Sequence, residues 1–213
     1  MSGIMLAFIG GAGGGPPTVI GQAFGGGYYA GQIGVSSVAT HYLVVGPVAS
    51  AQSAKDYRNA GGTTAGADSN IDGPQNTADM VADGSSTVYP AAHFCNDLVI
   101  GGFSDWYMPA KNELEVCYYN LKPTTATNNT SSGINANAVP ARAGNYTSGT
   151  PAQTAAVDFK SSGSEDFAAD NYWASTDYDS SFAWIQVFSN GYQTFYAAKN
   201  TPNLVRAVRR VPV

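Results

Sequence analysis

Charged residues are scarce in this chain of 213 residues. Lys, Arg, Asp and Glu make up 12% of the sequence and leave a formal net charge of −5, whereas about a quarter of residues are charged in an ordinary globular domain. The ten basic residues are scattered, apart from Arg206, Arg209 and Arg210. Because phosphate backbones are bound by clustered Lys and Arg, nucleic acid is not an expected partner.

Cysteine and histidine are rarer still. Cys95 and Cys117 are the only cysteines, so no disulfide framework can form, and neither lies in a CxxC spacing that would indicate zinc. Both lie on expected helix faces among apolar residues, which favours buried free thiols; a single Cys95–Cys117 bridge is the alternative. His41 and His93 belong to no Ser/His/Asp arrangement and are expected to be structural.

Long apolar runs are absent as well. No segment approaches the ~20 residues of a membrane-spanning helix, so no membrane insertion is expected. Residues 3–12 are apolar, but glycines interrupt them and no basic leader precedes them, which argues against a signal peptide. The run Gly-Gly-Gly-Pro-Pro then forms a joint. We therefore expect an attachment arm over residues 1–17 and a single domain over residues 18–213.

Glycine and tyrosine, in contrast, are abundant, with 25 and 13 residues. An aromatic content of 12% is enough to build a core, so the chain is not a disordered one. Tyr, Ser, Gly and Asn together are also the composition of antibody paratopes, where rigid rings and small polar groups recognise varied targets. The plainer explanation is a β-rich secreted or virion-type protein of low charge.

Apolar spacing predicts the elements of the domain. Before residue 100 we expect a hairpin over 18–34 at a triple glycine, a strand over 41–48, a helical turn over 53–58, a Gly- and Asp-rich loop over 61–79, and helices over 78–82 and 90–98. Residues 122–171 hold few large apolar side chains, and a loop of that length must be tied to the core or be functional.

The last part of the domain reads as antiparallel sheet. Strands are expected over 171–176, 182–188, 191–197 and 203–211. Asn190-Gly191 predicts a type I′-like hairpin turn. In the last strand Leu204, Ala207 and Arg209 depart from the two-residue alternation, which predicts a bulge or an arginine held by a partner.

The segment from residue 101 to 121 carries the most specific pattern. Pro109 is suited to a helix start, and Leu114, Cys117 and Leu121 recur at helical spacing. We expect a helix from Pro109 to about Leu121 that buries these three residues and exposes Lys111.

This segment resembles the helix entry W-R-L-P-x-x-x-E-L of the C-type-lectin-like superfamily, which includes formylglycine-generating enzymes, the Lcl C-terminal adhesin domain and phage tropism determinants. The matching parts are, in order, Gly101-Gly-Phe-Ser-Asp-Trp-Tyr-Met-Pro109, Tyr172-Trp-Ala-Ser175 and Val205-Arg-Ala-Val-Arg-Arg210. The resemblance implies an α+β, C-type-lectin-like fold with short antiparallel sheets, two helices and long loops. It also implies that residues 204–211 pair with residues 18–24.

The resemblance implies binding rather than catalysis. Formylglycine-generating enzymes hold copper through a cysteine pair in their C-terminal half, and no cysteine follows residue 118 here, so we expect no enzyme. Similar domains are common in phage tail fibres, which implies a virion tail adhesin for a host-surface glycan or protein. The alternatives are a structural virion protein, such as a head decoration or tail-assembly component, and a calcium-dependent sugar-binding protein of cellular origin.

In similar phage tropism determinants the recognition surface lies just before the C-terminus. The matching positions are Ser175, Asp177, Tyr178, Asp179, Gln186, Asn190, Tyr192, Gln193, Tyr196, Asn200 and Asn203. These are residue types that make adaptable contacts. For Tyr192 and Tyr196 the alternative is that they are ordinary strand residues.

One cluster has the spacing of a calcium loop. Asp68, Asn70 and Asp72 alternate before Gly73, and Asp79 lies at the twelfth position. Against calcium, Pro74 stands where a carbonyl ligand is expected and Asp79 replaces the usual glutamate. The ordinary interpretation is a turn whose side chains bond their own backbone. No other cofactor is expected.

The apolar arm predicts an attachment surface. Each large side chain between Ile4 and Ile9 is worth roughly 1.5–3 kcal/mol when buried, so we expect residues 3–12 to pack against a homotrimer mate or a tail-fibre stem. Deleting residues 1–15 should leave a folded domain that no longer enters particles. Normal incorporation of the truncated protein into virions would contradict this role for the arm.

Overall fold

The computed structural model describes residues 16–213 and shows a mixed α+β domain with antiparallel sheets, as the sequence predicts. The strands are β1 (Ala23–Phe24), β2 (Gly27–Val35), β3 (Val38–Val45), β4 (Gln52–Lys55), β5 (Asn171–Asp177), β6 (Phe182–Val187), β7 (Gln193–Ala198), β8 (Asn203–Arg206) and β9 (Val208–Pro212). The helices are α1 (Val48–Ala51), α2 (Gly73–Asp83), α3 (Pro90–Asn96) and α4 (Lys111–Leu121), with a 3₁₀ turn over Val157–Phe159. Residues 1–15 of the expected attachment arm lie outside the described residues.

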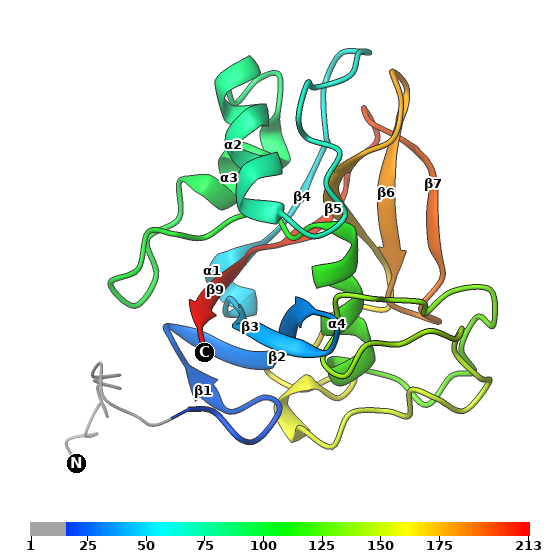
Figure 1. Ribbon diagram of the computed structural model, residues 1–213. Helices are drawn as coiled ribbons and strands as arrows, with labels where there is room; N and C mark the ends of the chain where they lie inside the picture. The colour runs from blue at the N-terminus through cyan, green and yellow to red at the C-terminus, as the bar shows by residue number, and fades with distance from the viewer. Residues whose placement is uncertain (1–15) are drawn as a thin grey trace.

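The strands form two sheets, ordered β1-β2-β3-β9 and β4-β8-β5-β6-β7. Helix α4 lies between them, α2 and α3 lie beside the second sheet, and the long loop wraps round the far end of α4 (Figure 1). Strands β8 and β9 are separated by Ala207 alone. One short stretch of chain therefore serves both sheets.

The first hairpin has the turn that its glycines predict. Gly25 and Gly26 have φ of 57° and 84°, which only glycine adopts without strain, and they join β1 to β2. The expected pairing of residues 204–211 with residues 18–24 is wrong, because β9 pairs with β3. Two-residue β1 is at the opposite edge of that sheet, and the long β2–β3 hairpin stands between them.

Three other expectations also need correction. Residues 52–55 form strand β4 rather than a helical turn, because β8 supplies a full ladder of partners. Helix α2 begins at Gly73, inside the expected loop, where Asp72 caps its first turn and proline follows. The β6–β7 connection is also longer than a two-residue turn and spans residues 188–192.

Helix α4 confirms the helix prediction, with Ala110 as its N-cap one residue after Pro109. Leu114, Cys117 and Leu121 are buried as expected. Lys111, however, is only half-exposed, because its Nζ lies 4.0 Å from the centre of the Trp184 ring. Burial lowers the pKa of this amine.

The second sheet is sandwiched between two hydrophobic clusters. One contains Tyr118 of α4 with Tyr172 and Phe188, and the other contains Trp173 with Cys95 of α3. Strand β5 is therefore covered on both faces. The two cysteines belong to different clusters and are free, buried thiols, which confirms the expectation for them.

Buried charge is concentrated in glutamate–arginine pairs. The sequence holds three glutamates, and each is almost fully buried and paired with an arginine. The pairs are Glu113–Arg210 at 2.8 Å, Glu115–Arg142, and Glu165–Arg206 at 2.9 Å. Arg206 and Arg210 lie on either side of Ala207, the residue that separates β8 from β9. Arginines held by glutamate partners are therefore found where the two-residue alternation of the last strand fails.

Among residues 16–213, no helix is both long and apolar enough to cross a membrane.

Candidate functional site

A β-bulge shapes the outermost hairpin of the second sheet. The pairing of β6 with β7 passes from Ala183↔Ala197 to Ile185↔Thr194. One residue, Trp184, therefore stands opposite two, Phe195 and Tyr196. Such a bulge turns neighbouring side chains of one strand toward the same side.

The result is a continuous group of rings, which we call the aromatic face: Tyr178, Phe182, Trp184, Phe195 and Tyr196. Tyr178 and Phe195 stack with ring centres 3.8 Å apart, and Trp184 meets Phe195 edge-on at 5.2 Å. Tyr196 contacts Phe195 at 4.2 Å and Phe182 at 6.4 Å. Each ring is thus held in place by another ring before any partner binds.

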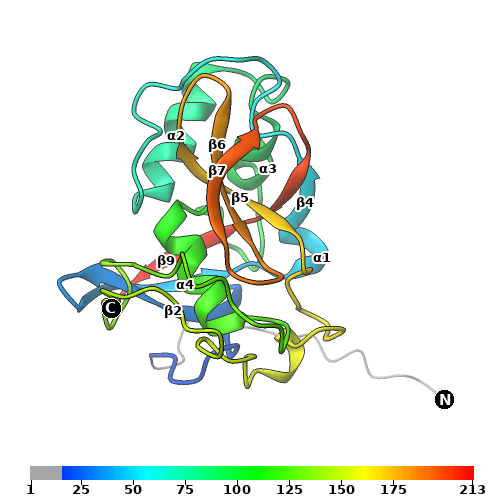
Figure 2. The same cartoon turned by 90° about the vertical axis from the view of Figure 1, so that its right-hand side faces the viewer.

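The aromatic face is open to solvent. Tyr178 is 48% and Tyr196 68% exposed, and the other three rings are half-buried. In Figure 2 the β6–β7 hairpin stands in front with no helix across it. Lys111, at the first turn of α4, closes one side by stacking on Trp184.

Three of the residues predicted to bind a ligand do not reach the surface. Ser175 is buried in β5 and its hydroxyl accepts a hydrogen bond from Asn76. Asp177 is paired with Lys199 at 2.5 Å and accepts a hydrogen bond from the Thr64 amide. Gln186 is 1% exposed. Alternation along an isolated strand would point Ser175 and Asp177 outward, but their strand, β5, is covered on both faces.

The remaining predicted residues lie around the hairpin. Asp179 and Asn190 shape turns. The Asp179 carboxylate accepts hydrogen bonds from two backbone amides, and the Asn190 side-chain oxygen accepts one from the backbone amide of Tyr192. Gln193 donates to the Lys111 carbonyl at 3.3 Å. Of the predicted set, the exposed or partly exposed members are Tyr178, Asp179, Asn190, Tyr192, Gln193, Tyr196, Asn200 and Asn203.

Phe182, Trp184, Phe195 and Lys111 are missing from the sequence-based set. Phe182 and Trp184 share one side of an alternating strand, which the sequence shows, but the same pattern is typical of a core. The bulge in β7 brings Phe195 and Tyr196 against these two rings, and no residue of β7 marks it in the sequence. Chain composition alone could not locate it.

The calcium-like spacing is used differently in the structure. Asp68 and Asn70 are exposed, Asp72 caps α2, and Asp79 accepts a hydrogen bond from Gln75 at 2.8 Å. Asp72 also lies 3.6 Å from Arg210. Within residues 16–213 no group of three or more His, Cys, Asp or Glu side chains converges as a metal site. Of these residues, Asp72 serves the start of α2 by accepting a hydrogen bond from a nearby backbone amide, as the ordinary interpretation predicts.

Comparison with known proteins identifies one family. The model of the Lcl C-terminal domain family matches residues 62–209, which is well over half of the chain and includes β5 to β8, the aromatic face and the long loop. No curated protein matches the chain.

Proposed function

The chain belongs to the Lcl C-terminal domain family, and from that premise we propose that it is a phage tail-fibre or tail-tip adhesin with a C-type-lectin-like fold. It binds a host-surface glycan or protein through the β6–β7 hairpin, while residues 1–17 join it to other virion proteins and to mates in a homotrimer. The virion setting rests on the resemblance of its motifs. The binding role is supported by the aromatic face.

The physical support is the exposure of pre-packed rings. A contiguous group of exposed apolar side chains often marks an interaction site, whereas single exposed apolar residues are ordinary. Tyr and Trp are frequent among the residues that dominate binding energy, and they lose little conformational freedom on binding. Since Tyr178 and Phe195 are already stacked, a partner binds a surface that needs no reordering.

The site offers little for catalysis. Burial raises the pKa of both thiols, so neither forms a thiolate near neutral pH. His93 is held by the Gly84 carbonyl at 2.7 Å, away from the aromatic face. Recognition without a chemical step, and without a cofactor, is the function that we propose.

The double variant Tyr178→Ala/Tyr196→Ala tests the aromatic face. Two exposed anchor rings at about 1–2 kcal/mol each should weaken host-cell binding by at least about 30-fold. The variant should fold normally because both rings protrude. Val157→Ala, which truncates another exposed apolar residue on the distant 3₁₀ turn, is the control. Binding of purified protein to host cells and virion adsorption are the measurements.

Unchanged adsorption by particles that carry the double variant would refute attachment through this face. If particles instead fail to assemble or lack the protein, the face is an interface inside the virion. That result would favour the alternative, a head decoration or tail-assembly component.

A further inference from the structure

The long loop between α4 and β5 is anchored by one buried carboxylate of α4. Glu115 accepts hydrogen bonds from the Tyr146 hydroxyl at 2.6 Å and the Asn135 amide at 2.5 Å, and it pairs with Arg142. All three partners come from the loop. The loop is therefore tied to the core, as its length and composition predict, and its shape near α4 is fixed.

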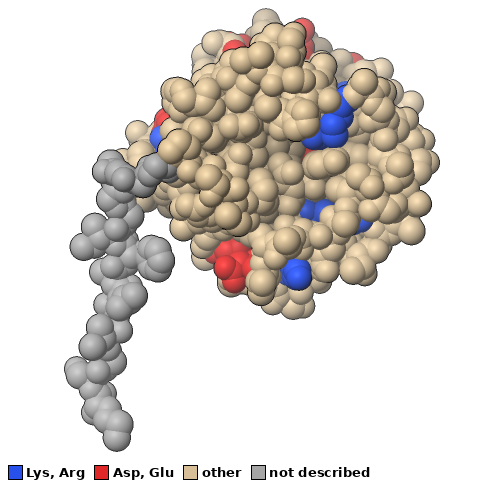
Figure 3. All heavy atoms as spheres, turned by 60° about the horizontal axis from the view of Figure 1, so that its bottom comes forward, with Lys and Arg blue, Asp and Glu red and all other residues tan. Residues whose placement is uncertain are grey.

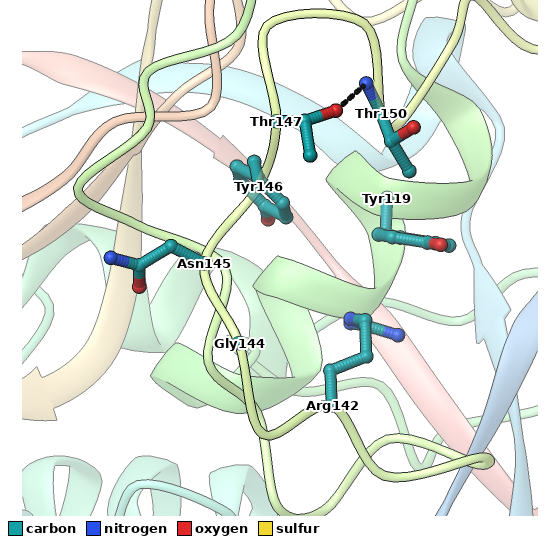
Figure 4. Close-up of a pocket in the computed structure, with 7 residues that line it drawn as sticks. All are labelled: Tyr119, Arg142, Gly144, Asn145, Tyr146, Thr147 and Thr150. Atoms are coloured by element: carbon teal, nitrogen blue, oxygen red, sulfur yellow. Dashed lines mark hydrogen bonds between the residues drawn. The ribbon is translucent and has the colours of Figure 1, made fainter.

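Two of the anchoring residues, Arg142 and Tyr146, also line a surface pocket of about 260 Å³. Its lining consists of Tyr119, Arg142, Gly144, Asn145, Tyr146, Thr147 and Thr150. In Figure 4 the loop from Arg142 to Thr150 curves past Tyr119, and the Thr150 amide donates to the Thr147 hydroxyl across its turn. The face of the molecule drawn in Figure 3 is largely uncharged, with scattered Lys, Arg, Asp and Glu side chains.

The pocket is electrically balanced. Arg142 is its one ionised lining residue, and Glu115 beneath it supplies the compensating charge. The guanidinium lies 4.0 Å from the centre of the Tyr119 ring and stacks on it. An anionic ligand would find this cation already paired, so a neutral ligand fits the charge of the site better.

The rim supplies hydrogen-bonding groups that the fold leaves available. Within residues 16–213 the side chains of Asn145 and Thr150 have no hydrogen-bond partner, and both residues are exposed beside the pocket. The Tyr119 hydroxyl likewise has no partner among the described residues. An amide and two hydroxyls offer donors and acceptors at separate points of the rim, and the Asn145 amide projects to the opposite side from the Tyr119 hydroxyl (Figure 4).

We propose that this pocket binds one neutral pyranose ring of a glycan. Its volume is small beside that of typical ligand pockets and suits a single ring. A sugar has apolar C–H faces for the tyrosine rings and hydroxyls that both donate and accept. The site is separate from the aromatic face, because Tyr119 lies eight residues, or about 12 Å, along α4 from Lys111.

The test is an NMR titration of the ¹⁵N-labelled protein with methyl glycosides of glucose, galactose, mannose and N-acetylglucosamine. We expect at least one of them, at about 20 mM, to shift the amide signals of Gly144, Thr147 and Thr150, since single sugars bind with dissociation constants near the millimolar range. Glucuronate serves as the acidic probe. We expect it to bind more weakly than the best neutral sugar.

The variant Asn145→Ala/Thr150→Val removes two polar groups at the rim of the pocket, neither of which makes a hydrogen bond within residues 16–213. It should raise the dissociation constant at least fivefold, whereas Thr201→Val, at another exposed threonine, should leave it unchanged. No shift around the pocket with any glycoside, or an unaltered constant in the double variant, refutes the proposal. A preference for glucuronate refutes the neutral ligand. Shifts confined to β6 and β7 refute the pocket and leave attachment through the aromatic face standing.

Discussion

Replacing Glu115 with alanine should lower the free energy of unfolding by about 3–5 kcal/mol, because removing one partner of a buried ion pair leaves the other uncompensated. The stranded group is Arg142, only 17% exposed at its side chain. The Tyr146 hydroxyl and the Asn135 amide lose their acceptor in the same substitution. The loop over residues 122–170 should detach from α4 while the two sheets persist.

Chemical denaturation and amide hydrogen exchange measure these two effects. Exchange should accelerate in residues 132–150 before it does so in β5 or β6. Asp97→Ala, which removes an exposed carboxylate, is the control and should cost less than about 0.5 kcal/mol. The double variant Glu115→Leu/Arg142→Leu should recover part of the loss, since no unpaired charge remains. A loss below about 1 kcal/mol for Glu115→Ala would contradict the anchoring role.

Raising the pH above 10 should unfold the domain steeply. Tyr57, Tyr107, Tyr146 and Tyr172 are buried, and burial raises the pKa of each hydroxyl above its ordinary value of 10. A hydrogen bond to a carboxylate raises the pKa further for two of them, because Tyr107 donates to Glu113 and Tyr146 to Glu115. The native state therefore keeps at least these four protons, which the unfolded chain loses.

The sign follows from proton linkage. Above pH 10 the native state binds more protons than the unfolded state, so stability is intact below pH 10 and falls as the pH rises. Each tyrosine contributes about 1.4 kcal/mol per pH unit, and four contribute about 5–6 kcal/mol per unit. Lys111 and Lys199 act in the opposite direction just below 10.5, because burial lowers the pKa of each amine.

Urea midpoints measured between pH 8 and 11.5 test this expectation. Tyr57→Phe removes one titrating hydroxyl, which donates a hydrogen bond to the Ser175 carbonyl at 3.0 Å. The variant should start slightly less stable and then lose stability less steeply above pH 10, by about 1.4 kcal/mol per pH unit. Equal slopes for the two proteins would show that this hydroxyl does not control alkaline unfolding.

Local signals in the sequence predicted the local structure well. Proline and helical spacing located α4, and paired glycines located the first turn, because both act through backbone sterics within a few residues. Pairing between distant strands was harder to predict. The wrong partner for β9 and the missed strand β4 both depend on residues more than 100 positions away in the sequence, where no local preference decides.

The candidate sites divide in the same way. Composition and the resemblance pointed to the β6–β7 region, and Tyr178 and Tyr196 are indeed exposed there. Ser175 and Asp177 were misplaced because their strand is covered on both sides, a property of the whole fold. The pocket beside Tyr119 had no sequence signal at all, since Glu115 looks like any helix-surface glutamate until its loop partners are known.

The placement of β8 and β9 also constrains how the chain can be made. Among residues 16–213, strand β4 pairs with β8 alone, and β9 completes the sheet that begins at β1. During synthesis, β4 therefore lacks its partner, and the first sheet lacks its edge strand, until residues 203–212 have been made. Folding that depends on such distant contacts is slow. Any nascent chain stopped before residue 203 is a substrate for chaperones or proteases rather than a smaller version of the domain.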